Sequence, residues 1–531
     1  MFKRLLLLAT LVSGPLVAAD VPFSRLVDAA NEPASWLMYW GDYHATRFRD
    51  LKQIDERNVS RLGLEWAFQT GAPGSFETVP LVVDGVMYFT TPDSSAYAID
   101  ARFGRTLWHY QYRVPSEAHP CCGTVNRGLA ILGHRLFMLT PDAHLLALDA
   151  RDGKLLWDVP VAVSNSGSFG AAAAPLIVKD KVVVGIAAGD YGIRGFIDAY
   201  DASTGKRAWR FWTIPGPGES GHETWSGDSW RHGGGATWMT GTYDAELNTV
   251  YWGIGNPAPD LAGAVRLGDN LYTDSLVALD GDTGRLKWHY QATPHDVHDW
   301  DAVEAPVLLD LPWKGEPRKL VVQANRNAFF YVLDRLSGAL LLGVPFAKQT
   351  WAAGIDPKGR PITIPNLDPT PTGTVVCPQC IGATNWMAPS YNPITGLFYL
   401  SVMEGCDRYF SEPPVYKEGS LYWATFFQGE PLAGNHGRVA ALDPTTGTTR
   451  WSFPLYSASW SGTLTTSGGL VFAGDADGYL MALEARTGKL LWRVNTGAQL
   501  MTSPITYQVD HRQYLTMPAG ATVFTFALPP E

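Results

Sequence analysis

The stretch ALDARDGKLLW, residues 147–157, carries the pattern that decides the fold. An Ala-x-Asp triplet is followed by glycine four residues after the aspartate, and by tryptophan four residues after the glycine. The aspartate can hydrogen-bond to the backbone of its own turn, and glycine can adopt the positive φ that a tight turn requires. The stretch therefore predicts a strand, a tight turn and an outer strand that the tryptophan caps.

The same pattern recurs along the chain. A copy at 332–342 has leucine where the tryptophan is expected. Five others keep the tryptophan, at 98–108, 199–209, 278–288, 441–451 and 482–492. Seven copies with one internal spacing indicate a repeat architecture. Apolar segments between the copies, such as 175–187 and 468–483, are expected to be the inner strands of four-stranded blades, which predicts an all-β propeller with tryptophan-docking repeats.

Each end of the chain offers part of one more repeat. The segment GLEW at 63–66 has the tryptophan without the triplet, and TVFTFAL at 522–528 has the strand without the tryptophan. We therefore predict an eight-bladed β-propeller, a single domain over 20–531 in which strands from both termini complete one blade. The intervals 209–288 and 342–451 are too long for one plain blade each, so they are expected to hold insertions, and such loops tend to carry function.

The N-terminus and the charge of the chain indicate an exported protein. Two basic residues at 3–4 precede an apolar run at 5–12 and a small-residue triplet at 17–19. This predicts a secretory signal peptide over 1–19, with no transmembrane segment after its removal, because the apolar run is too short to span a bilayer. The formal net charge of −10 argues against nucleic acid as a partner.

A propeller alone specifies no activity, so function has to be read from the loops. The motifs there are CCGTVNRG (121–128), GDYGIRG (189–195), GGGATW (233–238), GNPAPD (255–260), PHDVHDWD (294–301), ANRNAFFYVLDR (324–335) and GATNW (382–386). With the tryptophan repeats, they resemble the quinoprotein alcohol dehydrogenases (methanol/ethanol dehydrogenase family) over essentially the whole mature chain. The resemblance implies pyrroloquinoline quinone (PQQ) and a metal ion on the axis of an eight-bladed propeller.

Cys121 and Cys122 are adjacent in HPCCGTVNRG. Neighbouring Cα atoms lie about 3.8 Å apart, closer than the ~4.4–6.8 Å usual for disulfides. The residues by themselves leave open two reduced thiols or a strained disulfide of the kind found at functional sites. The resemblance implies the disulfide, lying flat against one face of the quinone, with Trp238 stacked on the other face. It also implies a second disulfide, Cys377–Cys406.

Several other positions are similar to residues that contact PQQ in the family. Arg127 would pair with a carboxylate of PQQ, because the planar guanidinium matches a carboxylate in shape. The remaining positions of this kind are Glu77, Asn385 and Trp460. Ala172 and Ala236 stand where the family has threonine, so some side-chain hydrogen bonds to PQQ are expected to be missing.

Carboxylate and amide side chains are expected to bind the metal ion, since hard cations prefer oxygen. Asn256 in GNPAPD matches a ligand of the family, and Asp190 stands where the family usually has glutamate. Asp299 resembles the catalytic base. Asp301 adds a carboxylate typical of the lanthanide-using branch, in which a trivalent ion needs extra negative charge. The resemblance therefore implies one ion, Ca²⁺ or a lanthanide.

These residues imply a reaction. The ion would polarise the quinone as a Lewis acid, Asp299 would accept the alcohol proton, and hydride would pass from the alcohol carbon to the quinone. Arg326 would hydrogen-bond to the reduced oxygen and stabilise negative charge there. In CPQC, Cys380 is followed by Ile381 rather than by the histidine of a haem site. Electrons are therefore expected to pass to a separate acceptor such as a c-type cytochrome.

Three functions remain open from the sequence. The first is a periplasmic PQQ-dependent enzyme that oxidises a primary alcohol to the aldehyde. The second is a quinoprotein dehydrogenase that acts on sugars or aldehydes. The third is a non-catalytic propeller resembling outer-membrane assembly scaffolds, which share the tryptophan repeats but have no reason to keep the cysteine pair, Asn256 and Asp299 together.

Overall fold

The computed structural model describes residues 20–72, 74–116, 122–163, 169–431, 434 and 436–530. Strands dominate these residues. The helical segments are short, namely α1 (Phe23–Val27), η1 (Ala29–Asn31), η2 (Val59–Arg61), η3 (Gly189–Tyr191), η4 (His222–Thr224), η5 (Ser229–His232) and η6 (Gly263–Val265). Across the described residues, no helix has the length and apolar character to cross a membrane. The prediction of an all-β protein is confirmed.

Four four-stranded sheets follow one another in the first part of the chain. The first contains β3 (Leu81–Val83), β4 (Val86–Thr90), β5 (Ala96–Asp100) and β6 (Arg105–Tyr110). The second contains β7 (Ala130–Leu132), β8 (Arg135–Leu139), β9 (His144–Asp149) and β10 (Leu155–Pro160). The third contains β11 (Leu176–Val178), β12 (Lys181–Gly185), β13 (Phe196–Asp201) and β14 (Arg207–Trp212). The fourth contains β15 (Thr242–Asp244), β16 (Thr249–Gly253), β17 (Ser275–Asp280) and β18 (Leu286–Gln291).

Four further sheets use the rest of the chain and its N-terminal segment. One contains β19 (Val307–Trp313), β20 (Glu316–Ala324), β21 (Phe329–Asp334) and β22 (Leu340–Pro345). The next contains β26 (Ser390–Asn392), β27 (Leu397–Met403), β30 (Gly437–Leu442) and β31 (Thr449–Leu455). The five-stranded sheet contains β1 (Phe48–Arg49), β32 (Leu464–Thr466), β33 (Leu470–Gly474), β34 (Tyr479–Glu484) and β35 (Leu490–Asn495). The last contains β2 (Gly63–Gln69), β36 (Ile505–Val509), β37 (Arg512–Ala519) and β38 (Thr522–Ala527).

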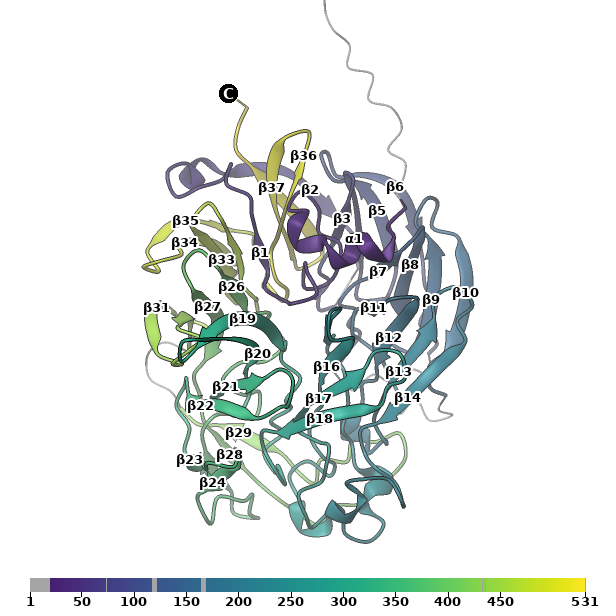
Figure 1. The fold of residues 1–531 in the computed structure, drawn as a ribbon, viewed down its shortest axis with the longest axis vertical. Coiled ribbons are helices and arrows are strands. Elements are labelled where there is room, and N and C mark those ends of the chain that lie inside the picture. Colours follow the sequence, from purple (N-terminus) through teal and green to yellow (C-terminus); the bar gives the residue numbers. More distant parts are fainter. Residues whose placement is uncertain are drawn as a thin grey trace, which may run out of the picture.

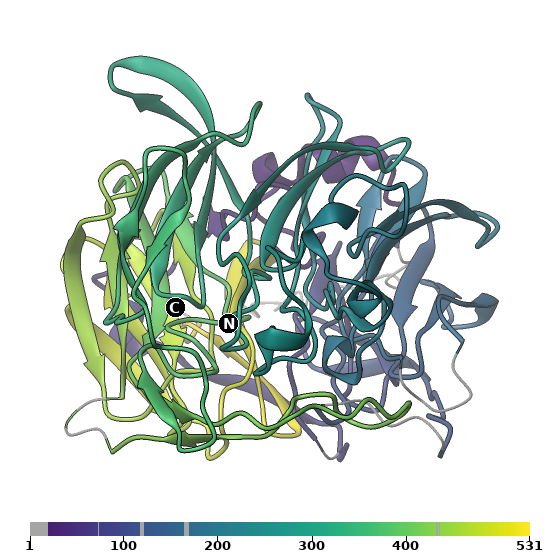
Figure 2. The same cartoon turned by 90° about the horizontal axis from the view of Figure 1, so that it is seen from below.

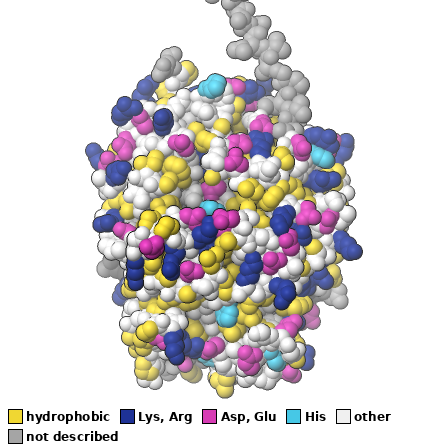
Figure 3. All heavy atoms as spheres, in the orientation of Figure 1, with side chains coloured by type: hydrophobic (Ala, Val, Ile, Leu, Met, Phe, Trp, Pro, Cys, Tyr) yellow, Lys and Arg dark blue, Asp and Glu magenta, His cyan; other side chains and the backbone are white. Residues whose placement is uncertain are grey.

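The sheets are arranged around a common centre, and strands from the two ends of the chain lie side by side (Figure 1). N-terminal β2 pairs antiparallel with C-terminal β38. Buried apolar side chains fill the space between neighbouring sheets; one cluster joins residues of β4, β20, β27 and β37, and another joins residues of β8, β9, β12 and β16. On the face of the molecule seen in Figure 3, acidic and basic side chains are interspersed.

The repeated stretch forms the predicted hairpin. In ALDARDGKLLW, β9 pairs antiparallel with β10, and Arg151 donates its backbone N–H to the carboxylate of Asp149 at 2.9 Å. The tryptophan of one repeat packs on the glycine of the next. At Gly338, φ is +73°, and an added Cβ would lie 2.5 Å from the Trp288 ring, so only glycine fits. The Trp288 indole N–H also donates to the Arg335 carbonyl at 3.1 Å.

The insertion predicted within 342–451 contains additional strands. Two small sheets lie between β22 and β31, one of β23 (Ala352–Ile355) and β24 (Pro361–Thr363), the other of β25 (Thr374–Val376), β28 (Asp407–Tyr409) and β29 (Phe427–Gly429). Figure 2 shows a long green connection crossing the lower face of the molecule. The segment between β28 and β29 reaches the η3 turn, where the Tyr422 N–H donates to the Asp190 carbonyl at 2.6 Å.

Candidate active site

Three loops that are separate in sequence are joined by backbone hydrogen bonds. They are the η3 loop, the glycine-rich loop at 233–238 and the loop at 255–260 that follows β16. The Gly255 N–H donates to the Ala236 carbonyl at 2.7 Å, and the Gly234 N–H donates to the Ile193 carbonyl at 2.8 Å. Neither glycine has room for a side chain. An added Cβ on Gly255 would meet the Asp301 carboxylate, and one on Gly234 would meet the backbone of the 255–260 loop. The glycines therefore bring three motifs into one site.

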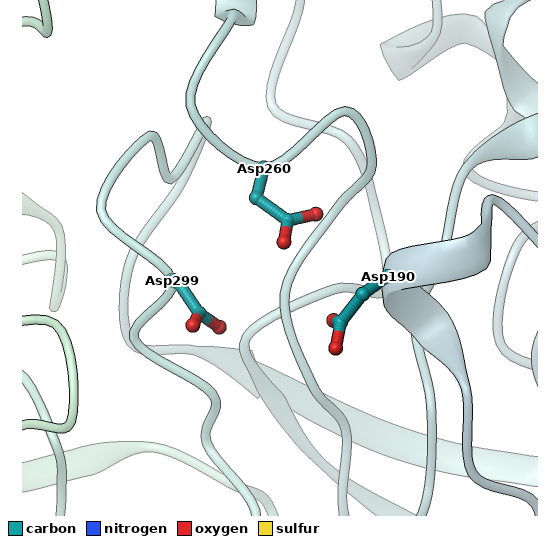
Figure 4. A group of neighbouring side chains, drawn as sticks. All are labelled: Asp190, Asp260 and Asp299. Carbon is teal, nitrogen blue, oxygen red and sulfur yellow. The ribbon is translucent and has the colours of Figure 1, made fainter. Parts of the chain in front are cut away.

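Three carboxylates converge at this junction. Oxygens of Asp190, Asp260 and Asp299 lie within 4.8 Å of one another, and the side chains point toward a common centre (Figure 4). Such a group of oxygens suits a hard cation. Asp190 and Asp299 were expected as ligands, whereas Asp260 was not. The signal for Asp260 is its position at the end of GNPAPD, four residues after Asn256.

Asp301 lies outside this group of carboxylates and has other partners. Its Oδ1 accepts the backbone N–H of Asn256 at 2.7 Å, and its Oδ2 accepts the indole N–H of Trp238 at 3.0 Å. Arg326 Nη2 lies 3.1 Å from the same Oδ2. The structure thus links Asp301 to the expected cofactor residues, and its role as a metal ligand remains a prediction.

Arg326 connects several predicted site residues. Its Nη1 donates to the Asp299 carbonyl at 2.7 Å and lies 3.4 Å from the Asp299 carboxylate. Its Nη2 donates to Asn385 Oδ1 at 3.4 Å. Arg326 is buried, and its Nε has no hydrogen-bond partner among the described residues. The guanidinium therefore fixes the Asp299 loop and retains a donor for a ligand.

Two guanidinium groups lie close to the Trp238 ring. Arg127 is 4.9 Å and Arg326 is 5.8 Å from the centroid of its ring. Arg127 also pairs with the buried carboxylate of Glu77 at 2.6 Å. The chain thus brings together an aromatic face and two buried cations, which suits a planar, anionic ligand.

A second aromatic pair adjoins Trp238. Trp386 and Trp460 stack with ring centroids 4.7 Å apart. Trp386 also meets Trp238 edge to face at 6.4 Å. The sequence predicts that Trp460 contacts the cofactor, but it does not predict a role for Trp386. The signal for Trp386 is its position directly after Asn385 in GATNW.

Burial changes the acidity of the carboxylates. It raises the pKa of Asp299 well above its ordinary range; Arg326 opposes this shift, whereas Asp301 and Asp190 add to it. Burial likewise raises the pKa of Asp260, with further contributions from Asp190 and Asp299. A bound cation would favour the ionised forms. The acidic residues therefore fit the metal ion that the sequence implies.

Comparison with known proteins identifies the family. Residues 36–350 match the family model of the glucose/ethanol/alcohol dehydrogenase β-propeller domain, named for PQQ. The chain is 37% identical over 97% of its length to quinoprotein alcohol dehydrogenase PedH of Pseudomonas putida, 91% of which is covered. It belongs to the PQQ-dependent alcohol dehydrogenases. The predicted resemblance and the assignment as an oxidoreductase are confirmed.

Other similar proteins include enzymes named for lanthanide ions. The chain is 36% identical to the lanthanide-dependent methanol dehydrogenase of Methylacidiphilum fumariolicum, over 93% of this chain and 86% of the relative. A europium-containing methanol dehydrogenase superposes with a TM-score of 0.91 at 33% identity, covering 95% of this chain and all of that one. Residues 435–523 also match the model of the outer membrane protein assembly factor BamB, a likeness confined to one part of the chain.

The cysteines of this quinoprotein divide into three groups. Cys377 and Cys406 form a disulfide, as predicted. Cys380 is free and buried, and its Sγ lies 3.2 Å from Asp299 Oδ2, so the thiol can donate to that carboxylate. Cys122 is exposed, whereas Cys121 lies outside the described residues, so the Cys121–Cys122 disulfide remains a prediction.

The two alanines that depart from the family pattern contribute backbone groups to the site. The Ala172 carbonyl accepts the N–H of Arg127 at 3.0 Å, and the Ala236 carbonyl accepts the N–H of Gly255. These alanines support the loops through the backbone and supply no side-chain hydrogen bond to a ligand.

Proposed function

We propose that the protein is an exported, periplasmic PQQ-dependent dehydrogenase that oxidises a primary alcohol to the aldehyde. The observation that carries this proposal is the position of Asp299. Its loop is held by Arg326, its carboxylate faces two further carboxylates, and Arg326 in turn lies over the Trp238 ring. A proton acceptor, a cation site and an aromatic platform are thus adjacent.

The cofactor would be held from both faces and along its edge. Trp238 would stack on one face, and the Cys121–Cys122 disulfide would lie on the other. Carboxylates and oxygens of the cofactor would be bound by a set of polar and aromatic residues, Glu77, Arg127, Arg326, Asn385 and Trp460. When bound, PQQ supplies the two-electron acceptor for the hydride of the alcohol.

The chain contributes a base and its surroundings. Asp299 would receive the hydroxyl proton of the substrate as general base. Burial alone favours its neutral form, so its ionised form depends on positive charge nearby. Arg326 provides one such charge, and an ion bound by Asp190, Asn256, Asp299 and Asp301 would provide another. The ion would be Ca²⁺ or a lanthanide, and relatives named for lanthanides support the second choice.

We extend the proposal to the architecture. Eight blades with tryptophan docking are supported by the eight larger sheets and by the Trp288–Gly338 contact, which other repeats share. Pairing of β2 with β38 supports a last blade built from both termini. The signal peptide over 1–19 and the periplasmic location follow from the sequence pattern. A separate acceptor such as a c-type cytochrome would take the electrons.

Reconstitution tests the activity. The purified protein is loaded with PQQ and either Ca²⁺ or La³⁺, and dye-linked oxidation is measured on primary alcohols, sugars and aldehydes. We expect alcohol oxidation, and at least about a hundredfold lower kcat for Asp299→Asn with PQQ still bound, the size typical of a lost general base. Absence of activity with either metal would contradict the proposal. Preference for a sugar or aldehyde would favour the second function considered above.

A scaffold without catalytic activity is the competing function, and the BamB match over 435–523 favours it. That match covers strands at the C-terminal end of the chain, while Asp190, Asp299 and Arg326 lie outside it. Binding of PQQ with no turnover on any substrate would favour the scaffold.

A further inference from the structure

The candidate metal site contains a carboxylate that the expected ligand set lacks. Asp260 is only 2% exposed, and its side chain points toward the same centre as Asp190 and Asp299 (Figure 4). Its Oδ1 has no hydrogen-bond partner among the described residues. A buried carboxylate without a partner is costly, and buried charges in proteins are normally paired or bound to metal. A cation bound next to Asp260 would therefore stabilise its ionised carboxylate.

Arg266, which lies beside this loop, does not pair with the Asp260 carboxylate through a hydrogen bond. Arg266 Nε donates to the Pro259 carbonyl at 3.1 Å, and its Nη2 donates to the backbone carbonyl of Asp260 at 3.0 Å. Its Nη1 donates to Asn270 Oδ1 at 2.8 Å. The guanidinium thus holds the backbone of the 255–260 loop, and it leaves the Asp260 carboxylate directed at the carboxylate group.

Asp301 offers a contrast within the same site. Its two oxygens already accept hydrogen bonds from Asn256 and Trp238, and Arg326 balances its charge. A carboxylate engaged in this way has less capacity for an ion than Asp260, whose Oδ1 has no hydrogen-bond partner among the described residues. The two aspartates therefore have different surroundings, although both are buried beside Asp299 in this site.

We propose that Asp260 is a direct ligand of the metal ion, together with Asp190 and Asp299. It would add a negative charge to those of Asp190 and Asp299 and make up for the short reach of Asp190, which stands where the family resemblance implies the longer glutamate. Three carboxylates favour a trivalent over a divalent ion, because affinity for hard cations rises with ligand charge. This inference rests on the metal site of the proposed function.

Metal binding to the PQQ-loaded, chelator-treated full chain tests the inference. Tb³⁺ is titrated by luminescence, Ca²⁺ competes with it, and bound metal is counted by elemental analysis. We expect Asp260→Asn to raise the Kd for Tb³⁺ at least about tenfold, since loss even of groups that only support ligands costs 10–100-fold. The Ca²⁺ affinity should fall by a smaller factor. Asp368→Asn, which removes an exposed charge from the neighbouring surface groove, should change neither.

Two further measurements distinguish a lost metal ligand from a general loss of folding. Asp260→Asn removes an unpartnered charge, so its metal-free melting temperature should be no lower than that of the wild type, while its gain on adding Tb³⁺ should be smaller. Asp260→Glu should retain more Tb³⁺ affinity than Asp260→Asn. Tb³⁺ binding by Asp260→Asn within twofold of the wild type would overturn the role of Asp260 alone. Failure of the wild type to bind Tb³⁺ or Ca²⁺ would overturn the metal site and this inference with it.

Discussion

Among single residues, Trp238 connects the two parts of the site. Its ring faces Arg127 and Arg326, and its indole N–H donates to Asp301, which also accepts the backbone N–H of Asn256. One side chain is thereby tied to the arginines expected at PQQ and to the loop expected at the metal ion. A tryptophan in a glycine-rich loop, outside the repeat spacing, can be recognised from sequence. Its partners are visible only in the fold.

Trp238→Ala is expected to weaken PQQ binding at least about tenfold, because aromatic stacking on a planar ligand contributes about 1–3 kcal/mol. Trp238→Phe should restore part of the affinity. Titration of the metal-loaded protein with PQQ, followed by absorbance, measures the effect. Trp288→Phe is the matched control, since that tryptophan packs on a neighbouring repeat. If the control weakens PQQ as much as Trp238→Ala, the loss is one of folding rather than of stacking.

At the scale of elements, the residues of the hairpin turns determine where neighbouring strands end and begin. The same aspartate, glycine and tryptophan positions recur, and each has a defined role in the turn. In β9–β10, Arg151 hydrogen bonds lower the pKa of Asp149 to about 2. In β21–β22, Gly338 gives its turn a positive φ and leaves room for Trp288. These local interactions explain why the strands could be predicted.

Gly338→Ala should destabilise the protein more than Gly497→Ala. Both glycines have positive φ, +73° and +78°, so both substitutions strain the backbone. Only at Gly338 would the new Cβ collide with a ring, whereas nothing lies within 4 Å at Gly497. Overpacking of this kind costs about 1–3 kcal/mol. Melting temperatures of the two variants measure the difference, and equal values would contradict tryptophan packing as the reason for glycine at this turn.

The turn aspartate should make stability depend on pH. Because the folded-state pKa of Asp149 is lowered to about 2, its ionised form contributes stability above its ordinary pKa, and that contribution is lost as pH falls toward 2. Asp149→Asn should therefore melt below the wild type at pH 7, by an amount corresponding to about 1–3 kcal/mol. The gap should narrow between pH 5 and pH 3. A gap that stays constant over this range would exclude the charge of Asp149 as its cause.

At the scale of the whole molecule, the two ends of the chain depend on each other. Strand β2 pairs on one side with β38, and β38 pairs with β37. The Arg512 side chain also forms an ion pair with Glu65 on β2 at 2.6 Å. This sheet therefore combines a strand from near the start of the sequence with strands from residues 505–527, and it can form only when both segments are present.

Deletion of residues 522–531 should remove β38 and leave β2 and β37 with exposed edges. We expect a lower melting temperature and less soluble protein, because unpaired edge strands favour aggregation. Deletion of 528–531, which keeps β38, is the control. The two variants are compared by soluble yield and by thermal unfolding. Equal behaviour of the two deletions would contradict a stabilising role for pairing between the termini.

The sequence by itself determined the repeat, the all-β class and the family, and it predicts the side chains of a cofactor site. It could do so because each strand, turn or motif is specified by a few consecutive residues, through interactions between neighbours in the chain. The Cys377–Cys406 disulfide also followed, through the family resemblance.

Only the tertiary structure decided which groups surround each acidic residue. Asp190, Asp260 and Asp299 come from three loops, and no spacing along the chain states that their oxygens meet within 4.8 Å. Nor does any spacing state that Arg326 balances the charge of Asp301, while Oδ1 of Asp260 has no hydrogen-bond partner in the part of the chain that the structure describes. The energy of a buried charge depends on what surrounds it in space, and those neighbours are set by the packing of the sheets and the loops between them.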